Sequence, residues 1–443
     1  MKKNMFLFSA FVLSCVMVSC TSSEDIDLGE AKHVVNMLSE EPIQLTQEQQ
    51  AFANSNNGFT LNFLKTVNNV DKSGKSFIYS PLSITYVLGM VNDAATGQTE
   101  KELEQTLGFQ QGGIQAVNDY CKKLINGLPK VDKDVTLNIA NAIFLNKGRT
   151  LKKQFAEDVS SYYDATAETL DFKESKKSAD VINKWCDDKT NGMIPKILDS
   201  TDPSAVSYLL NAIYFKADWA SKFDKNNTKE EDFENQSGKI KLPLMHQNVL
   251  VNYLRNNVYS AVRIPYGNGL WSMDVMLPEE GKTVDDVIEH LAKYGLVDYD
   301  FCGTMRDTYS SYSDTYSAYE VDLKLPRYET ESDTDSKEVG GLIPLMKKLG
   351  IHLAFDGDFA EIPNMCEEGN VYISLMRQIA KIKVNEEGSE AAAVTVAAEN
   401  YTTSFTPDPV YPKATFHANK PFVYVIREQS SGVILFVGKF TGK

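Results

Sequence analysis

The sequence has 443 residues and a formal net charge of −15, from 60 acidic and 45 basic side chains. This balance argues against a surface built to bind nucleic acid or anionic membranes, because both require basic patches. Hydrophobic residues make up 42% of the chain and include 22 Phe and 21 Tyr, which is enough for a substantial core in one large or two medium domains.

The first 19 residues are predicted to be an export signal. They begin with Met-Lys-Lys and continue in an apolar run over residues 5–18 that is too short to span a membrane. The stretch MVSC, which ends at Cys20, resembles the cleavage motif of bacterial lipoproteins, in which the cysteine carries the lipid. Cys15, in VLSC, is a second candidate, and an ordinary secretory signal is the alternative.

The lipoprotein interpretation sets the expected organisation of the chain. Residues 20–44 are acidic and weakly patterned, which is typical of a tether. Residues 45–443 are expected to form the folded domain. The protein is then exported and lipid-anchored to a bacterial membrane, either in the periplasm or at the cell surface.

Taken in chain order, the polar and apolar pattern predicts a mixed α+β fold. Helices are expected from about Gln47, after Ser80, at 97–109, at 178–191 and at 283–294. Strands are expected at 137–146 and 207–219, both buried on two faces, then at 271–278 and 371–385, with a hairpin at 420–440. Residues 300–319 are rich in Ser, Thr, Tyr and Asp and are expected to form a surface insertion.

Motifs for catalysis or metal binding are weak. None of the five histidines lies in H-E-x-x-H, and G-x-S-x-G does not occur. SGKS at 73–76 lacks the upstream glycine of a phosphate loop, and SDTDSKE at 332–338 lacks the central glycine and final glutamate of a calcium loop, which favours a solvated turn. We therefore expect no enzyme activity, no cofactor and no metal.

Four cysteines remain after the predicted signal and its lipidation site. They are scattered without zinc-like spacing, so buried thiols are expected, with a disulfide left open because the protein is exported. They are Cys121, Cys186, Cys302 and Cys366.

The stretch VNEEGSEAAAVTVAAENYTTSFTPDPVYP, residues 384–412, contains no Lys or Arg. It passes from acids through small residues to three prolines, which cannot lie inside a sheet. Composition alone leaves two interpretations open. The segment is either a flexible connector, or a strand whose small side chains allow it to enter a sheet.

The beginning of this stretch, VNEEGSEAAAVT, resembles the hinge of the serpin reactive-centre loop. FIYSPLSI, AATGQTEKEL, NAIFL, NAIYFKADW, TNGMI, ANKPFVYVIRE and GVILFVGK also resemble serpin signatures and follow the order of that family. The similarity covers about residues 45–443. It implies three β-sheets, about nine helices and an exposed reactive-centre loop. It also implies a suicide substrate that a protease cleaves, after which the loop enters the large sheet and traps the enzyme.

The resemblance assigns roles to individual residues. Counting about seventeen residues from Glu386, at roughly 3.3 Å each, places the reactive bond at Thr402–Thr403. The residues after this bond, 403–416, are several more than is common in the family, which leaves the position of the bond open by one to three residues. The hinge residues are Glu386, Glu387, Gly388, Ser389, Glu390, Ala391, Ala392, Ala393 and Thr395.

The resemblance also implies residues that let the large sheet open. Trp219 matches the tryptophan at the top of that sheet, where insertion begins. Ser80, Ser83 and Asn211 match the central shutter, where the strands part. Gln378 stands where the family usually has His. Because glutamine does not titrate, this exchange puts in doubt a pH-dependent opening but not the opening itself.

The implied function is irreversible inhibition of elastase-like or subtilisin-like serine proteases, with papain-like cysteine proteases as a further class. Its partners are then the target proteases, which it binds covalently as a monomer. A non-inhibitory serpin that binds or carries a ligand is the alternative. The small hinge residues favour inhibition, because non-inhibitory members tend to carry bulky, charged or proline residues there.

Overall fold

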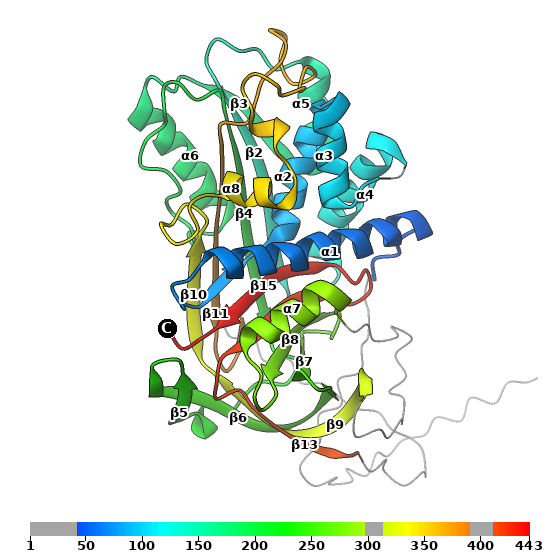
Figure 1. Cartoon of the computed structure of the whole chain (residues 1–443), viewed down its shortest axis with the longest axis vertical. Helices are drawn as coiled ribbons and strands as arrows, with labels where there is room; N and C mark the ends of the chain where they lie inside the picture. Colours follow the sequence, from blue (N-terminus) through cyan, green and yellow to red (C-terminus); the bar gives the residue numbers. More distant parts are fainter. Residues whose placement is uncertain (1–41, 111, 297–312, 390–410) are drawn as a thin grey trace, which may run out of the picture. The chain divides into compact units, whose positions relative to one another are not determined.

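The structure is a computed structural model that describes residues 42–110, 112–296, 313–389 and 411–443, with the side chains of 313–317 left out. Figure 1 shows the arrangement of its elements. No helix among the described residues has the length and apolar character needed to cross a membrane.

Eight α-helices and three short 3₁₀ helices lie in the described residues. The first helix begins with a capping box, in which Thr46 and Gln49 each bond the other's backbone N–H. The helices are α1 Gln47–Val70, α2 Pro81–Ala94, α3 Gly97–Leu107, α4 Gly113–Gly127, α5 Lys153–Tyr163, α6 Ser175–Lys189, α7 Val284–Tyr294 and α8 Leu342–Leu349, with η1 Leu128–Lys130, η2 Lys225–Asn227 and η3 Leu353–Phe355.

Fifteen strands complete the described part. They are β1 Phe77–Tyr79, β2 Thr136–Asn146, β3 Ala165–Leu170, β4 Ser207–Asp218, β5 Lys229–Asn235, β6 Gly238–Arg255, β7 Tyr259–Tyr266, β8 Trp271–Pro278, β9 Ser313–Pro326, β10 Tyr328–Asp333, β11 Leu375–Val384, β12 Gly388–Ser389, β13 Lys413–His417, β14 Phe422–Glu428 and β15 Ile434–Phe440.

Hydrogen bonding joins these strands into two sheets. The six-stranded sheet has the order β10-β11-β12-β4-β2-β3, and the nine-stranded sheet runs β1-β15-β14-β8-β7-β6-β9-β13, with β5 beside β6. Three sheets were expected. The 18-residue β6 accounts for the difference. Its first part pairs with β5, the rest pairs with β9, and its last four residues also pair with β7, so this one strand joins two groups of strands.

Helices cover both faces of the six-stranded sheet near β2 and β4. The helix α2 packs on one face of these strands, and almost all of its residues are buried. The helix α6 covers the other face, where Phe144 and Tyr208 join Ala179 and Ile182 in a separate hydrophobic cluster. This two-sided packing confirms the expectation from the long apolar runs at 137–146 and 207–219.

The expectation of a surface insertion at 300–319 is wrong in its last part. The strand β9 begins at Ser313 and pairs along its length with β6, and Tyr319 packs against Tyr253 with ring centroids 5.1 Å apart. Tyr and Thr favour strands even where the composition is polar. The many serines and aspartates of this segment instead led to the prediction of a loop. Residues 300–312 lie outside the described residues.

Candidate functional site

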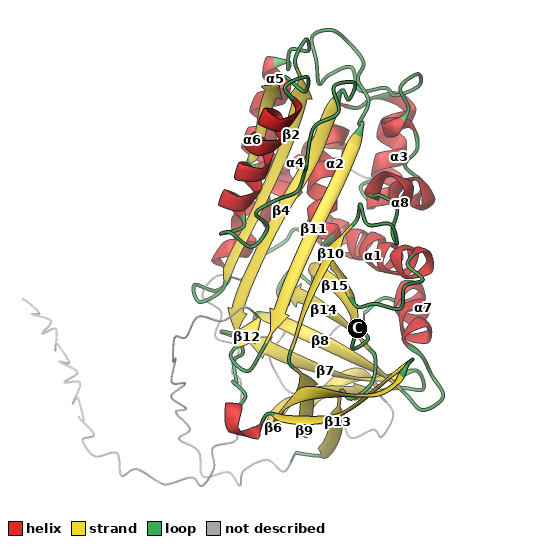
Figure 2. Cartoon of the chain, turned by 90° about the vertical axis from the view of Figure 1, so that its left-hand side faces the viewer, coloured by secondary structure: helices red, strands yellow, loops and turns green. Residues whose placement is uncertain are grey.

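The six-stranded sheet has an incomplete ladder between β4 and β11. These two strands pair in parallel only at one end, where Leu375–Gln378 of β11 lies beside 208–211 of β4. Beyond these residues, 379–383 of β11 and 212–216 of β4 do not pair with each other. On the side away from this opening, β11 pairs with β10 and β4 pairs with β2. The facing edges therefore form a ready site for one more strand (Figure 2).

The two residues of β12 already occupy the far end of this opening. Ser389 pairs with Val384 of β11 and with Ala217 of β4, both antiparallel, so the chain enters between the two strands. A Cβ on Gly388 would lie 2.1 Å from the carbonyl oxygen of Ala217. Only glycine fits so close to the neighbouring backbone.

Trp219 and Tyr266 both contact β12 and the residues just before it. Their rings stack with centroids 4.4 Å apart and planes 9° apart. The side-chain Nε1 of Trp219 donates to the carbonyl oxygen of Asn385 at 2.9 Å. The backbone N–H of Trp219 donates to the carbonyl oxygen of Glu387 at 2.8 Å. The hydroxyl of Tyr266 bonds the buried hydroxyl of Ser389 at 2.6 Å. The predicted Trp219 therefore lies directly against the predicted hinge.

Glu386 and Glu387 are held in different ways. The side chain of Glu386 is 4% exposed; it accepts a hydrogen bond from Thr228 at 2.8 Å and pairs with Arg327 at 3.4 Å. Glu387 is more exposed and pairs with Lys225 at 2.8 Å and Lys222 at 3.1 Å. The bond from Lys225, and then that from Lys222, lower the pKa of Glu387 below its ordinary value. Both carboxylates therefore anchor the start of the segment that follows.

At the paired end of the opening, Gln378 and Ser80 are joined through buried hydrogen bonds. Ser80 N–H donates to Oε1 of Gln378 at 3.0 Å, and Nε2 of Gln378 donates to the carbonyl oxygen of Ser80 at 2.9 Å. The hydroxyl of Ser80 bonds that of Ser83 at 3.0 Å and donates to the carbonyl oxygen of Leu435 at 2.7 Å. These bonds tie β11 to the start of α2.

Asn211 lies at the last residue pair before the strands separate, opposite Gln378. Its Nδ2 donates to Oδ1 of Asn141 on β2 at 2.8 Å. Its own Oδ1 is buried without a hydrogen-bond partner among the described residues. The four residues predicted for the shutter are thus gathered around one end of the opening.

The other predicted site residues lie outside the described residues. They are Glu390, Ala391, Ala392, Ala393, Thr395, Thr402, Thr403 and the lipidation candidates Cys20 and Cys15. For these residues, the sequence-based predictions stand untested.

Sequence reasoning missed the partners of the hinge. Tyr266 is on β7, Arg327 follows β9, and the two lysines and Thr228 come from the segment after β4. None of these residues belongs to a recognisable sequence motif, because single Tyr, Arg, Lys and Thr residues are common in any sequence. The closest signal was the position of Lys222 and Lys225, a few residues after Trp219.

The remaining motifs have structural roles. Asp333, in the weak calcium-like stretch, accepts two hydrogen bonds from Arg377 at 3.0 and 2.6 Å, and no group of metal ligands occurs among the described residues. Cys121, Cys186 and Cys366 are buried free thiols, and burial raises the pKa of each. Cys302 lies outside the described residues.

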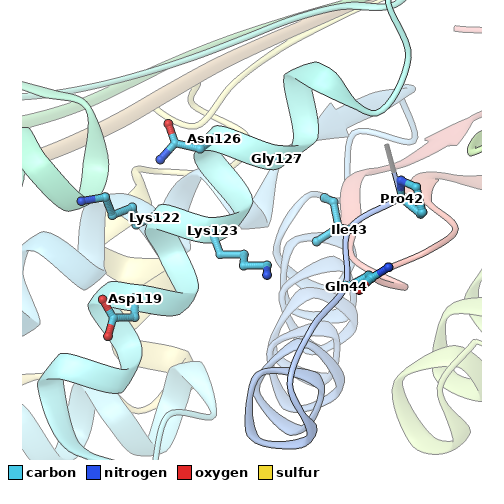
Figure 3. A pocket seen from close by; sticks show the side chains of 8 residues that line it. All are labelled: Pro42, Ile43, Gln44, Asp119, Lys122, Lys123, Asn126 and Gly127. Carbon is cyan, nitrogen blue, oxygen red and sulfur yellow. The ribbon is translucent and has the colours of Figure 1, made fainter. Parts of the chain in front are cut away.

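A surface pocket of about 510 Å³ lies apart from the strand opening, between α4 and residues 42–44 (Figure 3). Lys122, Lys123 and Asp119 supply its charged groups, and Ile43 and Pro42 its apolar wall. It is large enough for a small ligand.

Comparison with known proteins agrees with this geometry. The family model for serpins, described as serine protease inhibitors, matches residues 54–442, and the chain belongs to the serpin family. Human serpin I2 is 27% identical over 89% of this chain and 93% of its own length, and antitrypsin from Bombyx mori is 30% identical over 89% and 95%. The native structure of the thermophilic serpin tengpin superposes with a TM-score of 0.75 and 25% identity, over 90% of this chain and 95% of its own. The fold is the serpin fold.

Proposed function

We propose that this serpin is an irreversible suicide-substrate inhibitor of serine proteases. The observation that supports it most is the incomplete ladder between β4 and β11, which is paired at one end and entered by β12 at the other. A segment that continues from Ser389 as a new strand would complete the sheet and satisfy the facing backbone groups. The free energy gained by this insertion is what drives the trapping.

The proposed reaction begins as ordinary proteolysis. The serine hydroxyl of the protease attacks the carbonyl carbon of Thr402, and the peptide bond to Thr403 breaks. The amine of Thr403 takes up the proton and departs, while Thr402 stays esterified to the protease. Insertion of the cleaved segment then carries the attached enzyme along the sheet and distorts its active site before water can hydrolyse the ester. The protein is a substrate in this reaction and not an enzyme.

The hinge fits this role by the size of its side chains. Ser389, the second residue of β12, points inward, where its hydroxyl bonds that of Tyr266. Alternation along a strand would turn Ala391, Ala393 and Thr395 to the same inward face, and all are small. The opposite face would carry Glu390, Ala392 and Val394.

This alternation gives a direct test with a matched control. Thr395→Arg should convert the inhibitor into a substrate, because an unpaired charge would be buried on insertion. Val394→Arg places the same charge on the outward face and should still trap the protease. The measurement is the fraction of an elastase-type protease that forms an SDS-stable complex. Equal trapping by both variants would contradict the proposed insertion.

The second candidate is a non-inhibitory serpin that binds or carries a ligand. The pocket beside α4 favours it by size alone. Cleavage within 384–412 without any SDS-stable complex, together with unchanged thermal stability of the cleaved protein, would favour this candidate. A large rise in melting temperature on cleavage would favour the inhibitor.

The proposed location follows from the N-terminal sequence. A lipid on Cys20 would anchor an exported, monomeric inhibitor to a bacterial membrane. Cys20→Ala should move the protein from the membrane fraction to the soluble fraction, with Cys15→Ala as the control. Retention of the Cys20 variant in the membrane fraction would contradict the assignment.

A further inference from the structure

The pocket beside α4 carries more basic than acidic groups, although the chain as a whole is acidic. Its charged side chains are Lys122, Lys123 and Asp119, whereas the formal net charge of the chain is −15. Lys122 is held by the neighbouring helix α5, because its ammonium group donates to the hydroxyl of Ser161 at 3.2 Å and lies over the ring of Tyr162. The pocket therefore favours an anionic occupant.

Lys123 is the basic side chain of the pocket that is available for binding. It is exposed and forms no ion pair with the described residues. Figure 3 shows its ammonium group between α4 and residues 42–44. Asn126, three residues later on the same helix, is also exposed and adds an amide to this wall. A carboxylate that reaches this place would meet a charge that has no competing partner there.

The wall opposite α4 is the place where the described chain begins. Pro42 and Ile43 form its apolar part, and the backbone N–H of Ile43 donates to the hydroxyl of Ser430 at 2.8 Å. Gly127 lets Ile43 pack against the end of α4, since a Cβ there would lie 3.2 Å from the Ile43 side chain. This wall is therefore fixed, and the residues that precede Pro42 start at the edge of the pocket.

Residues 33–41, HVVNMLSEE, have the composition that this pocket accepts. They lie outside the described residues. The segment ends in Glu40 and Glu41, and the stretch VVNML at 34–38 is largely apolar. Two carboxylates followed by an apolar wall match two ammonium groups beside Pro42 and Ile43.

The segment is also long enough to follow the pocket. The lining residues of α4 run from 119 to 127, which is about 12 Å of helix at 1.5 Å per residue. Nine residues reach about 30 Å when extended. Because the segment is joined directly to Pro42, its effective concentration at the pocket is high, and weak contacts are enough to hold it.

We propose that residues 33–41 dock in this pocket along α4, with the carboxylates of Glu40 and Glu41 at Lys122 and Lys123. The docking does not depend on the inhibitory function. The pocket then holds part of the chain itself and is closed to a carried ligand.

Docking has a consequence for the tether, because it covers the residues next to a tryptic site. Lys32 is the only Lys or Arg in residues 20–41, and it immediately precedes the docked segment. Cleavage after Lys32 requires the following residues to detach, so its rate follows the population of the undocked form. If Cys20 carries the proposed lipid, docking then determines how readily a trypsin-like protease releases the domain from the membrane.

Hydrogen exchange of the purified, full-length mature protein tests the docking. The amides of residues 34–41, corrected for intrinsic exchange rates, should be protected in the wild type. Lys123→Glu replaces attraction by repulsion and should reduce this protection about fivefold. Lys101→Glu, which makes the same charge change on the exposed surface of α3, is the control and should leave it unchanged.

Charge reversal separates a direct contact from a structural effect. Glu40→Lys combined with Glu41→Lys should weaken the protection in the wild-type background, whereas the addition of Lys123→Glu to these two changes should restore part of it. Brief trypsin treatment gives a second readout. The appearance of His33 as a new N-terminus, measured by mass spectrometry, should be about fivefold faster in Lys123→Glu than in the wild type.

Equal protection of 34–41 in the wild type and in Lys123→Glu would overturn the docking, as would a loss of protection that charge reversal does not restore. Protection that increases with protein concentration would assign the pocket to the segment of a second copy. Protection that appears only when a small molecule is added would assign it to a carried ligand. Both of these results would overturn the contact within one chain.

Discussion

Gln378 bonds both the backbone N–H and the carbonyl oxygen of Ser80, at 3.0 and 2.9 Å, so a single amide side chain connects β11 to the first turn of α2. Both residues are buried, and Gln378 lies opposite Asn211 at the last residue pair before β4 and β11 separate. A side chain that cannot titrate therefore ties β11 to α2 beside the residue pair at which β4 and β11 separate.

The first prediction concerns this pair. Gln378→Met has a similar shape but leaves both backbone groups of Ser80 without this partner. The free energy of unfolding should fall by about 1–3 kcal/mol, the cost of burying unsatisfied polar groups. Gln154→Met, on the exposed surface of α5, should change it by less than about 0.5 kcal/mol. Urea-induced unfolding of the two variants measures the difference, and equal midpoints would show that the Gln378 bonds contribute nothing.

The second prediction concerns Gly388. A methyl group there would collide with the carbonyl group of Ala217, so Gly388→Ala should expel β12 and cost about 1–3 kcal/mol. Gly58, in the middle of α1, has open space at the same position, and Gly58→Ala should instead stabilise the helix by about 0.5–1 kcal/mol. Opposite signs are expected in thermal unfolding. If Gly388→Ala left the thermal stability unchanged, β12 would be able to move aside without a cost in free energy.

The third prediction concerns Glu386 and Glu387, whose contributions to holding the hinge should depend differently on salt concentration. Glu387→Gln should loosen the hinge slightly at low salt and have little effect at ~1 M salt, because exposed ion pairs are screened. The pKa of Glu387 is lowered, so its contribution is present above the ordinary value and lost as the pH falls through the lowered one. Glu386→Gln, at the buried site, should loosen the hinge at both salt concentrations.

Hydrogen exchange of residues 385–389 measures both variants. The wild type should lose protection in acid, and Glu387→Gln should lose less of it over the same pH range. A Glu386→Gln effect that disappears in ~1 M salt would contradict the buried role of that carboxylate.

The sequence predicted the strands that line the opening because their signal is local. The apolar runs at 207–219 and 371–385 match β4 and β11. The hinge motif was recognised by its resemblance to the serpin family. The opening itself could not be predicted, since it depends on which residues of two distant strands pair and which do not. The same limit applies to Tyr266, which reaches Ser389 only because of how distant strands are aligned in the fold.

The last prediction concerns the class of protease, and it depends on the composition of 384–412. A trypsin-like primary pocket has a buried carboxylate that requires Lys or Arg from the substrate. Between Lys383 and Lys413 the sequence has neither, so a shift of the reactive bond by one to three residues does not help. Trypsin should not be trapped, because its unpaired carboxylate reduces transition-state binding by several kcal/mol.

Thr402 suits the small or medium pocket of elastase-like and subtilisin-like enzymes, and Tyr401 offers a weaker site for chymotrypsin-like ones. The protein should be incubated with one protease of each kind, and the new C-terminus identified by mass spectrometry. We expect covalent trapping of the elastase-like enzyme with an end at Thr402. Thr402→Arg provides the matched gain-of-function variant, since it should make the bond a trypsin site and move the covalent complex to trypsin. Efficient trapping of trypsin by the wild type, with an end inside 384–412, would contradict the argument from composition.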